Sequence, residues 1–522
     1  MELSGIDALT MGSIVRRSAE RYPNRTAMIF NDERCTFKDY NARVNRAAHA
    51  LGKLGAQKGD HIAILGKNSI QYLELCHGTA KIGVVFGTIN WRLSADEIAF
   101  IVQDADNKIL FVEAGFQELL AKFRDQIPDI KVVIYGGKSV LPNAEQYEQL
   151  TAAASAEEPD VLVNGSDDAI IMYTSGTTGL PKGAVLAHSN IVWDSIYALT
   201  YVPPRQDDCF LLSMPMNHVS GLHTETTTCL ARGLPMVIMS QYEPEEACRL
   251  IEKHRITLAY FLVTPLLQLL ESPLRAKYDL TSLRRLLTAA SRYSPEVVVR
   301  ALKELGLDSM YFVYGLTEAA PIVSTTEYTA DMILKPNTMG QAVWYNDVRI
   351  VDDDGHSLPV NEVGEIVVRG PNVFKGYYKR PEANAQVLRN GWLHTGDLGY
   401  LDDEGFLFFV DRKKDMIKSG GENVYSIEVE MAIAKNNPEV SEVAVVGVPD
   451  PKWGEAVTAF VTLKQGLAIT EADLIARTRE ILAGYKLPKQ VIMCTELPKN
   501  VSGKVLKRQL RDTFMKDNKP AA

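Results

Sequence analysis

Residues 173–183 read YTSGTTGLPKG, and this stretch decides how the rest of the chain is interpreted. The apolar run 170–173 just before it predicts a short buried strand. The loop that follows is too rich in glycine and hydroxyl groups to pack as core. It is therefore built to meet a polar ligand.

The residue types in this loop suit contact with phosphate. Gly176, Gly179 and Gly183 allow the backbone to adopt positive φ angles and to approach a ligand closely. The side chains that could meet phosphate are four hydroxyls and one mobile ammonium, on Thr174, Ser175, Thr177, Thr178 and Lys182. This is the chemistry of a phosphate cradle, and the alternative is a flexible surface loop of the same composition.

The loop is not the common P-loop, which places Ser or Thr directly after its Gly-Lys pair to bind Mg²⁺. Here Gly183 follows Lys182, so a P-loop nucleotidase is disfavoured. At full length, YTSGTTGLPKG resembles the signature of the adenylate-forming superfamily. That superfamily includes acyl-CoA synthetases, aryl-CoA ligases, firefly luciferase and the adenylation domains of peptide synthetases.

Size and charge favour a soluble enzyme of at least two domains, because 522 residues exceed what one hydrophobic core normally supports. Lys and Arg total 56 against 65 Asp and Glu, a net charge of -9 without long runs of either sign. Nothing in this balance favours nucleic acid as a partner.

The chain is expected to be cytoplasmic. Its first residues lack the continuous apolar core of a signal peptide, and no apolar run approaches the roughly 20 residues that span a bilayer. Six cysteines are scattered without CxxC pairs, which suits reduced, mostly buried thiols.

The first third of the chain alternates between helical and strand patterns. Residues 11–58 have a helical pattern, 61–65 form a short apolar run, 69–82 return to helix, and 109–112 are again strand-like. Such alternation predicts parallel sheets covered by helices, the α/β class.

A second group of candidates follows the phosphate loop. His218 lies just beyond an apolar strand, and its spacing from Cys209, His223 and Cys229 matches no zinc module. Its Pro-x-x-His-x-x-Gly setting resembles the aromatic gate of the superfamily, between carboxylate and nucleotide. The resemblance implies an acyl pocket near His218, His223, Tyr260, 288–292 and 315–321. The pocket residues so implied are His218, His223, Ala289, Ala290, Ser291, Arg292 and Gly315.

The loop 289–292 departs from the superfamily pattern, which has small glycine-rich residues and then proline where this chain has Ala289, Ala290, Ser291 and Arg292. Three fates are open for Arg292: it points to solvent, pairs with an acid such as Glu225, or meets a polar tail of the substrate.

The pentad Tyr314-Gly315-Leu316-Thr317-Glu318 follows another apolar strand. An aromatic face suits a purine, a hydroxyl can donate to phosphate, and a carboxylate is a hard ligand for Mg²⁺. It resembles the second signature of the superfamily, which implies that Tyr314 stacks on adenine, Thr317 contacts the α-phosphate and Glu318 holds the metal.

Short strands and Gly or Pro turns between Gly340 and Val410 predict a small β-rich subdomain, at about 340–411. In it, the two oxygens of Asp397 could bind both ribose hydroxyls. The resemblance assigns Asp397 this role with help from Arg412, and it makes 411–415 the hinge, with Lys414 at the pivot. The alternative for this charge cluster is a solvated turn, and Lys413 is expected to be such a solvated charge.

The resemblance divides the chain into an adenylation domain, 1–411, and a mobile α+β lid domain, 412–522. In the lid, Gly420, Gly421, Glu422 and Trp453 resemble the CoA side of the ligases. Lys504 lies in the Pro-x-x-x-x-Gly-Lys setting of the superfamily's catalytic lysine. An ammonium there would offset the repulsion between carboxylate and phosphate.

The resemblance therefore implies an ATP- and Mg²⁺-dependent acid–CoA ligase, a monomer or homodimer, that works through an acyl-AMP. The implied catalytic residues are Lys504, His218, Glu318 and Thr174. The implied ATP-binding residues are Thr174, Ser175, Gly176, Thr177, Thr178, Gly179, Lys182, Tyr314, Gly315, Thr317, Glu318, Asp397, Arg412 and Lys504. Two alternatives are an adenylating enzyme that passes the acyl group to another acceptor, such as a carrier protein, and a non-catalytic nucleotide-binding relative.

Overall fold

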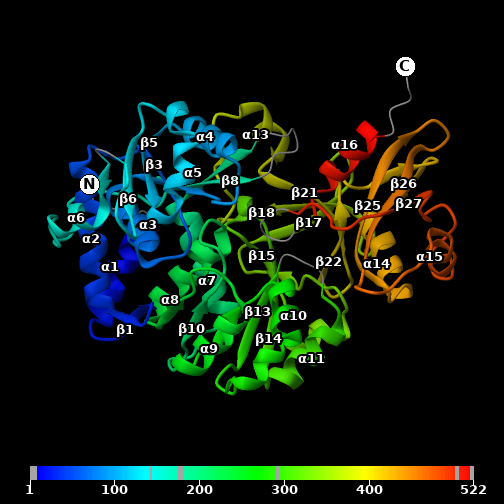
Figure 1. The fold of residues 1–522 in the computed structure, drawn as a ribbon, viewed down its shortest axis with the longest axis horizontal. Helices are drawn as coiled ribbons and strands as arrows, with labels where there is room; N and C mark the ends of the chain where they lie inside the picture. Colours follow the sequence, from blue (N-terminus) through cyan, green and yellow to red (C-terminus); the bar gives the residue numbers. More distant parts are fainter. Residues whose placement is uncertain (1–8, 142–143, 175–180, 290–292, 500–504, 518–522) are drawn as a thin grey trace. The chain divides into compact units, whose positions relative to one another are not determined.

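The computed structural model describes residues 9–141, 144–174, 181–289, 293–499 and 505–517 (Figure 1). The chain forms two compact units. Unit 1 comprises Met1–Val348 and Val368–Leu393, and unit 2 comprises Arg349–Val367 and His394–Ala522. The predicted domain boundary between residues 411 and 412 stays a prediction.

One sheet of unit 1 has eight strands in the order β19-β9-β8-β4-β3-β5-β6-β7. All neighbours from β8 to β7 run parallel, as the alternation of strand and helix predicts. Its strands are β3 (His61–Leu65), β4 (Val85–Ile89), β5 (Asn107–Glu113), β6 (Lys131–Tyr135), β7 (Glu145–Gln146), β8 (Asp168–Thr174), β9 (Lys182–Ala187) and β19 (Gly376–Tyr377).

The other sheet of unit 1 has nine strands in the order β16-β15-β14-β13-β12-β10-β11-β1-β2. Its centre is parallel, and β2, β15 and β16 add antiparallel edges. The strands are β1 (Thr26–Phe30), β2 (Glu33–Thr36), β10 (Phe210–Leu212), β11 (Met236–Ile238), β12 (Leu258–Tyr260), β13 (Arg285–Ala289), β14 (Ser309–Gly315), β15 (Ile322–Thr325) and β16 (Gln341–Ala342).

Helices of unit 1 cover these sheets (Figure 1). They are α1 (Met11–Arg21), α2 (Phe37–Lys53), α3 (Ile70–Ile82), α4 (Ala95–Asp104), α5 (Gln117–Ala121), α6 (Tyr147–Ala152), α7 (His188–Tyr201), α8 (Glu225–Arg232), α9 (Pro244–His254), α10 (Val263–Glu271), α11 (Pro295–Leu305), α12 (Thr329–Leu334) and α13 (Pro381–Val387). Local chemistry sets their ends. The Ser69 hydroxyl caps α3 by accepting from Tyr72 N, and Gly83 ends α3 in the left-handed region.

The prediction of a continuous helical pattern over 11–58 is wrong, because the hairpin β1–β2 separates α1 from α2. Asn31 and Asp32 have φ angles of 48° and 69°, and they join Phe30 to Glu33 in a two-residue turn. Such a turn matches the twist of paired strands and favours Asn or Asp at its left-handed positions. The Asn-Asp pair was therefore the signal for this hairpin.

Short strands occupy much of 341–412, as predicted. A five-stranded sheet contains β17 (Asp347–Val351), β18 (Gly364–Arg369), β20 (Leu388–Arg389), β21 (Trp392–Leu401) and β22 (Leu407–Arg412). The antiparallel pair β21–β22 puts Asp397 opposite Arg412.

The rest of unit 2 is an α+β arrangement, also as predicted. Its sheet has the order β24-β23-β26-β25, with β27 against β26. The elements are β23 (Ile417–Ser419), β24 (Glu422–Val424), β25 (Val440–Asp450), β26 (Gly454–Leu463), β27 (Gln490–Met493), α14 (Ser426–Asn436), α15 (Glu471–Thr478) and α16 (Lys507–Asp517).

Candidate active site

The phosphate loop connects two paired strands. In the antiparallel pair β8–β9, Thr174 lies opposite Lys182 and Tyr173 lies opposite Gly183, so both ends of the loop are fixed by the sheet. Gly183 is thus a strand residue, and the expectation of a left-handed loop glycine there is wrong because the ladder holds its backbone extended. Five predicted phosphate ligands lie outside the described residues: Ser175, Gly176, Thr177, Thr178 and Gly179.

Lys182 and Glu318 meet the same tyrosine. The Tyr377 hydroxyl donates to Glu318 Oε1 at 2.8 Å, and Lys182 Nζ lies 5.3 Å from the centre of the Tyr377 ring. Tyr377 is in β19, which pairs with β9 and sets Tyr377 opposite Ala184. A cation and a carboxylate are therefore mounted beside the end of the phosphate loop. Sequence reasoning missed Tyr377, since nothing in its pattern distinguishes it from Tyr378.

The second signature begins where β14 ends. Gly315 is needed there, because a Cβ on it would lie 1.9 Å from the Pro321 carbonyl oxygen, and Leu316 N donates to that oxygen at 3.1 Å. Tyr314 is 8% exposed, and Thr317 and Glu318 are half-buried in the single turn η5 (Thr317–Ala319). Thr317 and Glu318 therefore lie close together, just after the end of β14.

Strand pairing puts Ala289, the first residue of the predicted acyl-pocket loop, beside the strand that leads into this signature. In the parallel pair β13–β14, Ala289 lies opposite Val313, so the two strands end side by side. Ala290, Ser291 and Arg292, which follow Ala289, lie outside the described residues. The three fates of Arg292 therefore stay open.

The loop that carries His218 is held by a buried asparagine. Asn68 is 4% exposed, accepts from Met216 N at 2.7 Å and donates to the Met214 carbonyl at 2.8 Å. Burial, with a smaller contribution from Arg92, lowers the pKa of His218 to about 4. His218 is therefore neutral at physiological pH. Asn68 was missed because its only sequence signal is a polar residue after strand 61–65.

The segment after His218 buries several titratable groups. His223, in η3 (Ser220–Thr224), is 0% exposed, and burial lowers its pKa to about 3. Glu225 is 4% exposed, and burial raises its pKa well above the usual value. Neither side chain has a hydrogen-bond partner among the described residues. Burial thus favours the neutral form of both side chains.

An apolar cavity lies next to this segment. Its wall includes Tyr197, Tyr201, Tyr260, Leu287, Val313 and Pro321. Tyr260 and Pro321 fall in the regions predicted to surround the acyl pocket. Four of the predicted pocket residues are described, namely His218, His223, Ala289 and Gly315, and none of these four lines this cavity. The role of the predicted pocket residues stays a prediction.

The predicted ribose site is assembled within unit 2. Arg412 Nε lies 3.6 Å from Asp397 Oδ1, and Asp397 is 7% exposed. The pairing of β21 with β22 brings the two residues together, as the resemblance implies. Lys413 is not simply solvated, because its Nζ lies 3.0 Å from buried Glu365 and 2.8 Å from Asp353. The pivot candidate Lys414 is an exposed residue of the turn after β22.

The glycine pair of the predicted CoA side forms the turn between β23 and β24. Gly420 and Gly421 have φ angles of 63° and 90°, which other residues rarely adopt, and they join Ser419 to Glu422. Gly420 N donates to the Trp453 carbonyl at 2.7 Å. These four residues, Gly420, Gly421, Glu422 and Trp453, therefore lie together.

Two lysines flank the indole of Trp453. Lys452 Nζ and Lys489 Nζ lie 4.8 and 4.9 Å from its ring centre. Burial, together with Arg479 and Lys452, lowers the pKa of Lys489. The surface next to the Gly420–Gly421 turn is thus electropositive. Lys504, the predicted catalytic lysine, lies outside the described residues.

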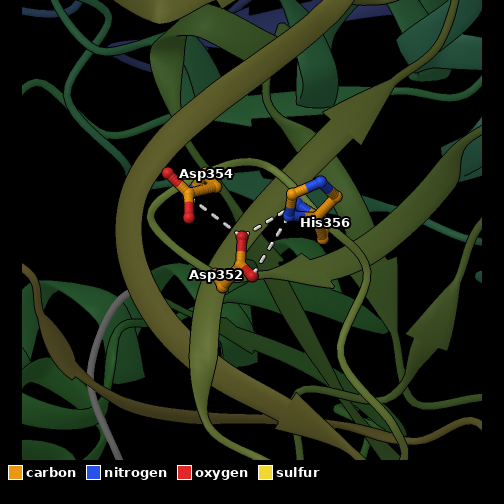
Figure 2. Close-up of side chains that lie close together, drawn as sticks. All are labelled: Asp352, Asp354 and His356. Atoms are coloured by element: carbon orange, nitrogen blue, oxygen red, sulfur yellow. Dashed lines mark hydrogen bonds and ion pairs between the residues drawn. The ribbon is translucent and has the colours of Figure 1, made fainter.

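In the described chain, three side chains capable of holding a metal ion gather only at Asp352, Asp354 and His356 (Figure 2). Hydrogen bonds of the turn explain this group, since Asp352 Oδ1 accepts from Asp354 N at 3.0 Å and from His356 N at 2.8 Å. Among the residues that the structure describes, Cys209, His218, His223 and Cys229 do not form such a group.

Two broader predictions concern the membrane and the cysteines. Among the described helices, none has the length and apolar character needed to cross a bilayer. All six cysteines are free thiols, four of them buried and two half-buried, as predicted.

The chain was compared with known proteins. The AMP-binding enzyme family matches residues 15–378, and the AMP-binding enzyme C-terminal domain matches residues 428–504. The chain is 36% identical over 507 residues to an indoleacetate–CoA ligase of Aromatoleum aromaticum, covering 96% of this chain and 98% of that protein. It is 35% identical over 507 residues to the long-chain-fatty-acid–CoA ligase FadD13 of Mycobacterium tuberculosis, covering 97% and 98%.

A solved structure agrees with this result. The o-succinylbenzoate CoA synthetase of Bacillus subtilis, in complex with the acyl-adenylate intermediate OSB-AMP, matches with a TM-score of 0.84 and 30% identity over 96% of this chain and 98% of that one. Fold and relatives together define an AMP-forming acid–thiol ligase. The chain belongs to the AMP-binding enzyme family, in the acyl- and aryl-CoA synthetase branch of the adenylate-forming superfamily. The predicted family, fold class and acid–CoA ligation are confirmed, whereas the roles of single residues stay predictions.

One prediction concerns Asp194 of α7, which links η3 to β15. It accepts from the Thr224 hydroxyl at 2.7 Å and from Ile322 N at 2.9 Å, yet burial raises its pKa from 3.8 to about 8. Between these pH values the folded chain keeps a proton that the unfolded chain has lost, so stability falls as pH rises from about 4 to about 8. Asp194→Asn cannot ionise, and its Tm should fall less than that of the wild type between pH 6 and pH 8.

Asp207→Asn is the matched control, because Asp207 is an exposed aspartate paired with Arg284. Its Tm should follow the wild type over this range. An equal pH response in wild type and Asp194→Asn, measured by thermal unfolding, would contradict a protonated Asp194.

A second prediction concerns Lys489. Coenzyme A carries several phosphate charges, and loss of one nearby cation commonly costs about 1 kcal/mol. Lys489→Ala should therefore raise the KM for CoA about threefold to tenfold and leave acid-dependent pyrophosphate release without CoA unchanged. Lys486→Ala is the control, since Lys486 pairs with Glu428 at 2.5 Å and its cation faces the Tyr485 ring instead. Equal KM values for CoA in Lys489→Ala and Lys486→Ala would show that Lys489 does not contribute to CoA binding.

Proposed function

We propose that this chain converts a carboxylic acid with an aromatic or arylalkyl body, ATP and CoA into the acyl-CoA thioester, AMP and pyrophosphate. First, a carboxylate oxygen attacks the α-phosphorus of ATP, and the bond from that phosphorus to pyrophosphate breaks. The thiol sulfur of CoA then attacks the acyl carbon, and the bond to the AMP oxygen breaks while the thiol proton leaves to solvent. Neither step needs a protein nucleophile, so catalysis rests on positioning and charge.

The observation that carries this proposal is the mounting of Lys182 and Glu318 at one end of the phosphate loop. Strand pairing fixes Thr174 opposite Lys182, and Tyr377 touches both Lys182 and Glu318. A cation, a hydroxyl and a hard carboxylate are the groups that a nucleoside triphosphate with its metal requires.

Mg²⁺ fits this arrangement. Glu318 is half-buried, and no described cation forms an ion pair with it, so its carboxylate keeps oxygen available for a hard ion. When bound there with ATP, Mg²⁺ would neutralise charge on the phosphate oxygens. Thr174 and Thr317 would donate to phosphate oxygens, and Lys182 would pair with them.

The other roles rest on the resemblance and on local geometry within each unit. Tyr314 would face adenine, neutral His218 would separate the acyl group from the nucleotide, and Asp397 with Arg412 would bind the ribose. The lid, 412–522, would turn about Lys414 between the two half-reactions to present Gly421. The enzyme would work in the cytoplasm, as a monomer or homodimer.

The class of acid is supported by the relatives. The relatives named for indoleacetate and for o-succinylbenzoate act on acids with an aromatic ring. A long-chain fatty acid is the second candidate, because FadD13 is 35% identical to this chain.

The substrate proposal is tested by pyrophosphate release with a panel of aryl, arylalkyl, short-, medium- and long-chain alkyl and dicarboxylic acids, with and without CoA. We expect the highest kcat/KM among the aryl or arylalkyl acids. A preference for long alkyl acids would favour the second candidate. Product release as an acyl-AMP, with no thioester formed from CoA, would instead favour an enzyme that serves another acceptor.

The role of Lys504 yields a separate prediction. Lys504→Ala should lower the adenylation rate about 10²-fold or more, because it removes a charge needed where carboxylate meets phosphate. Thioester formation from a supplied acyl-AMP should be largely spared. Stopped-flow or quenched-flow measurement of the two half-reactions separates these effects, and equal loss in both would be inconsistent with the assigned role.

A further inference from the structure

Tyr377 makes two contacts that the chemistry assigned so far does not use. Its hydroxyl donates to Glu318 Oε1 at 2.8 Å, while its ring faces Lys182 Nζ at 5.3 Å from the ring centre. Both partners are residues of the proposed ATP and Mg²⁺ site. One side chain therefore contacts the carboxylate and the cation of that site at the same time.

The hydroxyl contact fixes the carboxylate. No other described side chain hydrogen-bonds to Glu318, so its rotamer depends on this phenol. An ionised carboxylate only accepts hydrogen bonds, so the phenol is the donor in this contact. One lone pair of Oε1 is occupied, and the second oxygen keeps its capacity for a metal ion.

The ring contact holds the cation without neutralising it. An ammonium over an aromatic face is attracted by the ring quadrupole, an interaction of about 0.5–1 kcal/mol at an exposed site. A carboxylate in the same place would pair with Lys182 and weaken its attraction for phosphate. Lys182 is thus oriented with its full charge available.

The tyrosine itself is rigidly mounted. Asn384 of α13 accepts from Tyr377 N at 2.6 Å and donates to the Tyr377 carbonyl at 2.9 Å. Phe374 N donates to the Glu318 carbonyl at 2.9 Å, and the Phe374 ring packs edge-on against Tyr377, with 5.0 Å between centres. The segment 374–377 is therefore bonded to the backbone of the residue whose side chain it orients.

We propose that Tyr377 is a positioning residue of the Mg·ATP site, with two separable functions: its hydroxyl orients Glu318 for the metal, and its ring holds Lys182 for the phosphates. This inference rests on the proposed function, in which Glu318 meets Mg²⁺. Tyr377 lies outside both signatures of the superfamily, 173–183 and 314–318.

The test measures ATP binding without any acid, so that no turnover occurs. The Kd for ATP is determined by calorimetry with excess MgCl₂ and again with excess EDTA, and the ratio gives the coupling between metal and nucleotide. Tyr377→Phe keeps the ring and loses the hydroxyl. We expect its Kd in EDTA to equal that of the wild type and its coupling to fall about threefold to tenfold, as for loss of a hydrogen bond to a charged group.

Tyr377→Leu removes the ring as well. Its Kd in EDTA should rise about threefold in addition, because Lys182 loses its aromatic face. Tyr378→Phe is the matched control, since the Tyr378 hydroxyl also donates to a carboxylate, Asp106, at 2.8 Å. That variant should match the wild type under both conditions. If Tyr377→Leu fails to fold, the comparison of Tyr377→Phe with Tyr378→Phe alone decides whether the inference holds.

Glu318→Gln distinguishes failure of this inference from failure of the proposed function. If Glu318→Gln abolishes the coupling but Tyr377→Phe retains it, Tyr377 does not position the carboxylate and the inference is wrong. If Glu318→Gln retains the coupling, the proposed metal role of Glu318 is itself wrong. An equal loss of ATP affinity with and without Mg²⁺ in Tyr377→Phe would show a general structural role and would also overturn the inference.

Discussion

The antiparallel pairing of β8 with β9 is the constraint on which the rest of the site depends. The strands from β8 to β7 of this sheet run parallel, and a parallel connection would need a long crossover. The reversal at β8–β9 instead brings Thr174 and Lys182 into one register pair, with the phosphate loop between them. The loop is therefore short, and its two ends cannot separate without breaking the ladder.

The same reversal creates a place for β19. Because β9 continues the sheet, its outer edge is available for pairing, and Tyr377 comes to lie opposite Ala184, two residues after Lys182. Tyr377 then reaches Glu318, which follows the last residues of β14 in the other sheet of unit 1. One tyrosine thus connects the edge of one sheet to the signature that follows the other.

Burial decides the charge state of the residues after β10. His218 and His223 have pKa values lowered to about 4 and about 3, and burial raises the pKa of Glu225. Ionisation here would place unpaired charge in a poorly solvated region, so burial favours the neutral form of each group. In unit 2, by contrast, the surface beside the Gly420–Gly421 turn is positively charged, because Lys452 and Lys489 flank Trp453.

The sequence by itself determined the fold class and the family and indicated most of the candidate site residues, because these depend on local signals. Periodicity revealed α3 and β3, and the phosphate loop and the Tyr314–Glu318 pentad are contiguous motifs whose chemistry can be read in order. Only the tertiary structure revealed Asn68, Asp194, Tyr377 and Lys489, whose partners lie far away in the sequence. It also revealed the hairpin β1–β2, which the helical pattern around it concealed. A single side chain carries no sign of the distant group that it will meet, so hydrogen-bond partners and shifted pKa values are decided only when strand pairing and burial bring those groups together.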